Sequence, residues 1–282
     1  MKFPADSSSA EMLHDFEGAQ ALLYVRDGTV IRRLKKQPST SNVRMKPQDV
    51  LLSLQHDNLV RILHISHDDD MHMECMQVSL QRHMSAGHAC SDSVKLSVTR
   101  NVVSGLRHLH MRDLQHEDLC PNNILLAWKH GHMHVKLCDF YNEHTGASRT
   151  AAYAAPEVVL LHASDVTPAA DVWAFACCVL FMEGAEPFAG FEHAAAIYLY
   201  LGQHLCVAFQ DVCAVHKFAL RECAYAPAQH IADSMWAEIL AGIFVPHELR
   251  LSSLQLQHRL DALQAAPKQP APRAVLKRLN FC

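Results

Sequence analysis

Histidines are the residues whose number and spacing first suggest chemistry, because the 282-residue sequence contains 21 of them. Three stand at alternate positions in the tract HGHMH, as His130, His132 and His134. A period of two would place their imidazoles on one side of a strand, where they could bind a transition metal. No cysteine or carboxylate near the tract completes a ligand set, which favours the alternative of an exposed hairpin tip. Both interpretations stay open from the residues alone.

A second group of polar residues lies in four segments further along the chain. They are HEDLCPNNILL at 116–126, CDFY at 138–141, TAAYAAPE at 150–157 and DVWAFACCVLF at 171–181. In this order and spacing they resemble four parts of eukaryotic-type protein kinases: the catalytic loop, the metal-binding Asp-Phe-Gly segment, the substrate-positioning loop and the central helix of the large lobe. One such match would be weak evidence, whereas four in register are hard to reach by chance. The resemblance covers about residues 13–263.

The resemblance implies a site for phosphotransfer that uses ATP and Mg²⁺. By the family pattern Asp118 would accept or orient a substrate hydroxyl, while Asn123 and Asp139 would bind the metal. Thr150 stands where serine/threonine kinases place a hydroxyl near the catalytic aspartate. Such residues matter because phosphoryl transfer needs positioning and charge neutralisation more than covalent help from the protein.

The same resemblance assigns a nucleotide pocket to the first half of the chain. Gly18 would be the retained glycine of the phosphate loop, and Arg32 stands at the position of the lysine that contacts the α and β phosphates. Met73 would guard the back of the adenine pocket, and Val30, in place of the usual alanine, would narrow it. The residues expected to contact the nucleotide are Gly18, Leu23, Val30, Arg32, Glu74, Met76 and Leu125.

Departures from the family pattern begin in the part of the site that holds phosphate. Phe16 and Ala21 replace two glycines that let backbone approach the phosphates closely. Arg32 brings a bulkier, planar cation, so its exchange for lysine is not conservative. Pro47 stands where a helix glutamate would pair with that lysine, and Asp49 could substitute only if the helix register shifted.

The catalytic half of the site departs from the pattern as well. Tyr141 replaces the glycine of Asp-Phe-Gly, which removes backbone freedom there. Glu117 replaces an arginine that would bind a phosphate on the activation loop. The carboxylate of Glu117 would repel that phosphate instead. Cys120 replaces the lysine that neutralises the transferring phosphoryl group. Loss of one well-placed electrostatic partner commonly costs about a hundredfold in rate, so several losses together predict little turnover.

We therefore interpret the chain as a pseudokinase, a kinase-like domain that acts as a binding or allosteric module in signalling. The alternative is a weak or unconventional serine/threonine kinase that uses Arg32 or Arg33 with Asp118, Asn123 and Asp139. The surrounding frame is expected to be intact. Arg250 stands where the family pairs an arginine with the glutamate of Ala-Pro-Glu, here Glu157. One apolar column would contain Leu51, Leu63, His116 and Phe140, and another Leu23, Val30 and Leu125.

The elements that must position these residues can be read from the hydrophobic pattern. Asp27 and Gly28 stand between two apolar runs and predict a hairpin turn, since this dipeptide supplies positive backbone angles. Residues 36–44 are polar and are expected to be a connection. Strands are expected at 21–25, 29–34, 58–65, 71–76, 123–128 and 134–140, and helices at 47–54, 93–110, 171–184, 193–201 and 231–243. This order predicts an α+β, bilobal protein kinase-like fold, with a small β-rich lobe containing one helix and a larger helical lobe.

Composition sets the domain limits and the class of partner. A polar leader is expected at 1–12, a kinase-like domain at 13–265 divided near residue 76, and a proline-rich tail at 266–282, which either docks as a linear peptide or has no function. Half of the residues are hydrophobic and 19% are charged, which indicates a globular protein. A net charge of −4 gives no reason to expect nucleic acid or a membrane surface as partner. With neither a signal peptide nor a spanning segment apparent, a cytoplasmic protein with a protein partner or substrate is expected.

Overall fold

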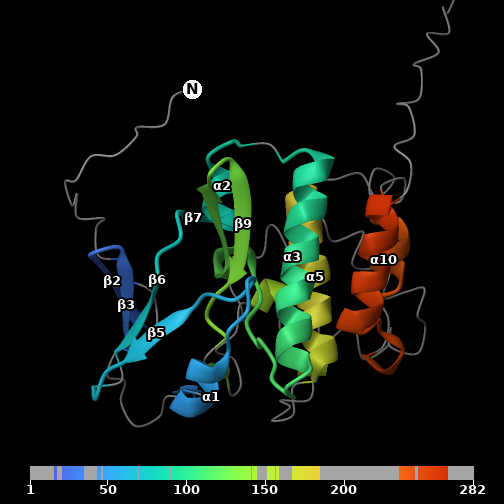
Figure 1. The fold of residues 1–282 in the computed structure, drawn as a ribbon. Coiled ribbons are helices and arrows are strands. Elements are labelled where there is room, and N and C mark those ends of the chain that lie inside the picture. The colour runs from blue at the N-terminus through green and yellow to red at the C-terminus, as the bar shows by residue number, and fades with distance from the viewer. Residues whose placement is uncertain are drawn as a thin grey trace, which may run out of the picture.

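The fold is described from a computed structural model of the chain. The structure describes residues 16–17, 21–34, 43–45, 47–68, 70–88, 90–140, 142–144, 151–155, 157–158, 167–184, 235–244 and 247–265. The predicted leader, the proline-rich tail and the predicted helix at 193–201 lie outside these residues. Within them, strands gather in the first part of the chain and long helices in the second, on opposite sides of Figure 1. This division confirms the predicted α+β fold.

An antiparallel five-stranded sheet forms the small lobe, in the order β1-β2-β3-β6-β5. Asp27 and Gly28 join β2 to β3 with φ angles of 49° and 71°. Two successive positive angles match the right-handed twist of the flanking strands, which is why the predicted hairpin forms here. The strands are β1 Phe16–Glu17, β2 Ala21–Arg26, β3 Thr29–Leu34, β5 Ile62–Ile65 and β6 Met71–Glu74.

The stretch expected to be only a polar connection contains a strand. β4, Val43–Met45, pairs antiparallel with β10, Asn142–His144, about a hundred residues later. Three residues are too few to show a period of two, so the partner decides the conformation. The following helix α1, Gln48–Ser53, has Pro47 at its N-cap and only six residues.

Three helices form the centre of the larger lobe. The helices α3, Asp92–His110, α5, Pro168–Met182, and α10, Ser253–Ala265, lie side by side in Figure 1, and α3 contacts both of the others. Nearly all of α5 is buried, as expected of a helix at the centre of a lobe. α10 was not predicted, although Leu256 and Leu260 lie one turn apart on its buried face. Two shorter helices are α2, Leu80–Ser85, and α9, Ala237–Ala241.

A second sheet orders its strands β7-β8-β9 and carries the histidine tract. His130 and Gly131 form the turn between β8 and β9 with φ angles of 51° and 80°, and His132 and His134 are exposed on β9. In the parts of the chain that the structure describes, no three histidines, cysteines or carboxylates converge as metal ligands. The tract is therefore the tip of a hairpin. The strands are β7 Val78–Ser79, β8 Ile124–Lys129 and β9 His132–Leu137.

The loop before β5 fastens the small lobe to the larger one. The Asn58 side chain donates to Asn101 Oδ1 at 2.7 Å and to the Val135 carbonyl at 3.0 Å. A Cβ on Gly105 of α3 would lie 2.9 Å from the Asn58 carbonyl, so only glycine permits this close approach. The two lobes are thus held together by specific contacts between this loop, α3 and β9.

Two histidines lie next to this loop. The ring centroids of His56 and His108 are 4.5 Å apart, and His56 Nδ1 accepts a hydrogen bond from the backbone N–H of Asn58. Burial lowers the pKa of both imidazoles. For His56 the nearby Asp57 opposes the shift, while Lys136 and Arg112 add to it. Both rings therefore favour the neutral form in the folded protein.

We expect acidification from about pH 7.5 to 5.5 to destabilise the fold through this pair. A histidine with a lowered pKa binds its proton more readily in the unfolded chain, so its contribution to stability is present above about pH 6.5 and is lost as the pH falls through the folded pKa. The difference in urea-unfolding free energy between the two pH values should be smaller in His108→Gln than in the unaltered chain. The exposed His132→Gln is the matched control, and an equal reduction in both variants would contradict the prediction.

The predicted apolar column is correct at three of its four positions. Leu51, His116 and Phe140 are fully buried, and the His116 and Phe140 rings meet edge to face at 6.4 Å. Leu63 was wrongly placed in the column, because its side chain is 47% exposed. A register shift between Ile62 and His64 turns Leu63 outward, and Ile62 and Ile65 face the core instead.

A buried arginine braces the larger lobe as predicted. Arg250 Nη1 lies 2.6 Å from Glu157 Oε1, and Nη2 lies 3.2 Å from Glu157 Oε2. Arg250 also donates to the carbonyls of Ile243 and Ala169 and stacks over the Trp173 ring. This ion pair is confirmed.

None of the helices in the described ranges combines the length and hydropathy needed to cross a bilayer.

Candidate active site

One buried carboxylate holds the loop that carries Asp118. Asp171, at the start of α5, accepts the backbone N–H of His116 at 2.8 Å and that of Glu117 at 2.9 Å. His110 Nε2 lies 2.9 Å from the same carboxylate. Burial alone would raise the pKa of Asp171, but the hydrogen bonds and charges of His110 and His116 outweigh it and lower the pKa. The loop is therefore anchored to an ionised group in the core.

The three predicted polar site residues meet around this loop. Asn123 lies in the short helical turn η1, Pro121–Asn123, and its Nδ2 donates to the Asp118 carbonyl at 2.7 Å. The Asn123 carbonyl accepts the Cys138 N–H at 3.0 Å, which ties the loop to the segment carrying Asp139. Asp118, Asn123 and Asp139 are thus brought together by local hydrogen bonds. Thr150 and Gly18 lie outside the described residues, so their assignment stays a prediction.

Arg32 and Asp139 form an ion pair across the cleft. Arg32 Nη2 lies 3.2 Å from Asp139 Oδ1, with the Arg32 side chain 5% exposed and the Asp139 side chain 27% exposed. Arg32 stands in the middle of β3, opposite Leu23 on β2 and Met71 on β6. The arginine at the position of the phosphate-binding lysine thus contacts the aspartate predicted to bind the metal.

The small-lobe helix offers no carboxylate at the position where the family has its glutamate. Pro47 precedes the first helical residue of α1, and Asp49 in its first turn is exposed. The register shift that would let Asp49 replace the glutamate is not observed. The carboxylate that Arg32 contacts therefore comes from the larger lobe.

Arg33 takes no part in the cleft, although it was considered as an alternative cation. Its guanidinium forms hydrogen bonds of 2.9 and 3.0 Å from Nε to the two oxygens of Asp70 and lies over the Tyr24 ring. Neighbouring residues of a strand point to opposite faces, so Arg33 turns outward where Arg32 turns inward. The hydrogen bond from Arg33 lowers the pKa of Asp70. The prediction that Arg33 could serve as the phosphate-binding cation was therefore wrong.

The expected metal ligands do not fit Mg²⁺ as they are arranged. Mg²⁺ requires near-octahedral oxygen ligands at about 2.0–2.1 Å. Asp139 would have to be one of them, but its carboxylate already contacts the guanidinium of Arg32. A dication and a guanidinium on the same carboxylate repel each other. The arginine would have to move before Asp139 could bind the metal.

Apolar side chains stand at several of the positions predicted to contact adenine. Val30 pairs with Met73 on the neighbouring strand, and Val30, Met76 and Leu125 are partly buried against the core. The Glu74 carboxylate contacts Lys136 Nζ at 2.6 Å and accepts the Arg61 N–H at 2.8 Å. Only backbone groups of Glu74 are therefore expected to serve a nucleotide.

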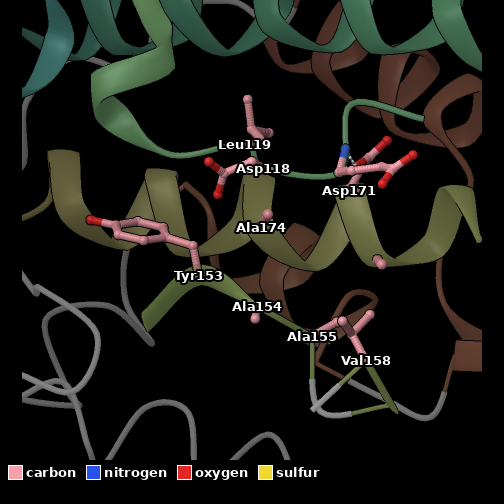
Figure 2. Close-up of a pocket in the computed structure, with 10 residues that line it drawn as sticks. Asp118, Leu119, Tyr153, Ala154, Ala155, Val158, Asp171 and Ala174 are labelled. Atoms are coloured by element: carbon pink, nitrogen blue, oxygen red, sulfur yellow. Dashed lines mark hydrogen bonds between the residues drawn. The ribbon is translucent and has the colours of Figure 1, made fainter. Parts of the chain in front are cut away.

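A hollow lies directly beside Asp118. Figure 2 shows the loop with Asp118 and Leu119 on one side of α5 and the segment with Tyr153, Ala154 and Ala155 on the other. The hollow is small, with a free volume of about 20 Å³. The segment predicted to position a substrate thus lines the same hollow as Asp118.

The sequence as a whole matches a known family. Residues 28–243, more than half of the chain, match the family described as protein kinase domain. The chain belongs to this family. The protein kinase domain is 27% identical over 197 residues to cell division control protein 2 homolog 1 of Trypanosoma brucei brucei, an alignment that covers 62% of this chain and 64% of that protein.

Two further relatives are serine/threonine or mitogen-activated kinases by name. Mitogen-activated protein kinase SLT2/MPK1 of Saccharomyces cerevisiae is 28% identical over 130 residues, covering 42% of this chain and 26% of that protein. Serine/threonine-protein kinase PLK4 of Drosophila ananassae is 30% identical over 176 residues, covering 57% of this chain and 21% of that protein. This protein kinase domain spans less than two thirds of the length of these relatives.

Some residues that build the site were not singled out from the sequence. Asp171 was predicted only as the first residue of a helix, and His110 only as the last of another, yet together they anchor the loop that carries Asp118. A charged residue at the start of an otherwise apolar helix was the available signal, since a buried charge needs partners. Asp70, which fixes Arg33, carried no such signal because it lies in an acidic turn.

Proposed function

We propose that this protein kinase domain is a pseudokinase, which has impaired phosphotransfer and acts as a binding or allosteric module for a protein partner in signalling. The observation that carries the proposal is the ion pair between Arg32 and Asp139 at 3.2 Å. In this pair, the carboxylate that is expected to bind Mg²⁺ contacts the cation that is expected to bind the phosphates of ATP. Phosphotransfer needs both groups on the triphosphate at the same time.

Changes around the catalytic loop support the same proposal. Glu117 adds a negative charge next to Asp118, and Cys120 is buried where a lysine would neutralise the transferring phosphoryl group. Each lost electrostatic partner typically costs about a hundredfold in rate. Together with the ion pair, two such losses would reduce turnover by about ten-thousandfold or more.

The alternative is a weak serine/threonine kinase. It is favoured by one observation, the hydrogen bond that keeps Asn123 and Asp118 in one ordered loop beside Asp139. Such a kinase would have to break the pair between Arg32 and Asp139 in each cycle. The cytoplasmic location and the protein partner likewise stay part of the proposal.

A radiolabel transfer assay tests the proposal. The full chain is incubated with γ-labelled ATP, Mg²⁺ and a generic protein substrate, beside Asp118→Asn and Asp139→Asn. We expect the same background incorporation of label with all three proteins, because no phosphate transfer depends on Asp118 or Asp139. Gln77→Ala, at an exposed position just before β7, is the matched surface control. Transfer by the unaltered chain that disappears in Asp118→Asn but not in Gln77→Ala would establish the alternative.

A further inference from the structure

The charge arrangement in the cleft bears on which cofactor it takes. We propose that the cleft binds an adenine nucleotide without a divalent cation, with Arg32 as the counter-charge for the phosphates. The inference rests on the proposed function, since it takes the cleft to be a nucleotide site that has lost its metal chemistry. Its starting observation is the 3.2 Å contact between Arg32 Nη2 and Asp139 Oδ1.

Arg32 is held inside the cleft. It lies at the centre of the five-stranded sheet, with β2 on one side and β6 on the other, and its side chain is almost fully buried. The outward position on this strand belongs to Arg33, which is fixed by Asp70. The guanidinium of Arg32 therefore stays where the phosphates of a nucleotide would lie.

Asp139 is held just as firmly from the other lobe. Its backbone has a φ angle of 63°, between Cys138, whose N–H donates to the Asn123 carbonyl, and Phe140, which is fully buried. A left-handed angle at a residue other than glycine persists only where its surroundings impose it. Neither partner can move away easily, so a divalent cation would meet a carboxylate already occupied by a fixed positive charge.

The chemistry of a guanidinium allows Arg32 to serve both a carboxylate and a phosphate. It has five N–H donors in a planar fork and cannot lose its charge, so it can contact Asp139 through one edge and phosphate oxygens through another. A metal ion would be needed to bridge the Asp139 carboxylate and the phosphates only if the Arg32 guanidinium were absent. Asp118 and Asp139 both carry negative charge in this part of the chain and would repel phosphate, so the nucleotide is expected to bind weakly.

The apolar part of the cleft supplies the remaining recognition. Val30 and Leu125 approach from the two lobes, and Met76 adds a third partly buried apolar side chain. Adenine stacks on such surfaces without any metal, because the interaction is apolar burial and backbone hydrogen bonding. A divalent cation therefore affects only the phosphate end, where Asp139 already contacts Arg32.

A titration with fluorescent mant-ATP tests the inference on the unaltered full chain. Binding is measured in EDTA and again with excess Mg²⁺. We expect binding in EDTA, and an affinity with Mg²⁺ that is unchanged within about twofold or weaker, since the cation cannot add a bond without removing one. An affinity that rises about tenfold or more with Mg²⁺, or no binding in either buffer, would overturn the inference.

Two variants identify the groups involved. Arg32→Met should weaken binding in EDTA by about tenfold or more, because a charge-assisted contact to phosphate is lost. Asp139→Asn should keep or strengthen it, since the change removes a negative charge beside the phosphates and leaves Arg32 in place. Loss of binding in a correctly folded Asp139→Asn, checked by circular dichroism, would contradict the role given to Arg32.

The outcomes also separate this inference from the proposed function. Metal-independent binding without label transfer supports both. Metal-dependent binding without transfer overturns the inference alone, whereas transfer by a chain that binds nucleotide in EDTA overturns the pseudokinase proposal alone. Transfer together with metal-dependent binding would overturn both.

Discussion

Replacing Arg250 with methionine is expected to destabilise the domain by about 3–5 kcal/mol. The Arg250 side chain is fully buried and donates to the Glu157 carboxylate and to the Ala169 and Ile243 carbonyls. Methionine fills much of the volume but leaves Glu157 as an uncompensated charge and two carbonyls without their donor. The loss of stability comes mainly from these buried groups that are left without a partner, and less from the lost attraction between Arg250 and Glu157.

The measurement is urea unfolding followed by tryptophan fluorescence. Arg100→Met is the matched control, because Arg100 also pairs with an aspartate, Asp261 at 2.7 Å, but both side chains are more than a third exposed. An exposed pair of this kind contributes at most about 1 kcal/mol. Equal losses in the two variants would show that Arg250 does not brace the lobe.

Replacing Asp171 with asparagine is the second change with a large expected effect, about 2–4 kcal/mol. The carboxylate accepts two backbone N–H groups and contacts His110, and an amide can reproduce only one of its two acceptor oxygens. Either His116 or Glu117 then loses the partner of its N–H group inside the protein. The loop that carries Asp118 should loosen before the domain unfolds.

Hydrogen exchange resolves this effect at the level of the loop. The amides of residues 116–119 should exchange faster in Asp171→Asn, alongside the loss of global stability in urea. Asp92→Asn is the control, since Asp92 is a largely exposed acid in the first turn of another helix and should change stability by less than about 0.5 kcal/mol. Unchanged exchange at 116–119 would mean that the loop is held by other contacts.

Local patterns determined much of this protein from the sequence alone. The Asp27 and Gly28 turn, the apolar periodicity of α3 and the order of four segments gave the fold class, because each depends on residues close in sequence. The same order placed Asp118, Asn123 and Asp139 in one site and paired Arg250 with Glu157. Residues close in sequence and motifs in register carry this information directly.

Contacts between distant residues decided the rest. The strand at Val43–Met45 exists through its pairing with residues 142–144, and the outward turn of Leu63 follows from a register shift between two strands. Above all, only the three-dimensional structure showed that Arg32 contacts Asp139 and that Arg33 turns to Asp70. A sequence shows which charges are present, but their pairing depends on which faces the folded strands turn toward each other.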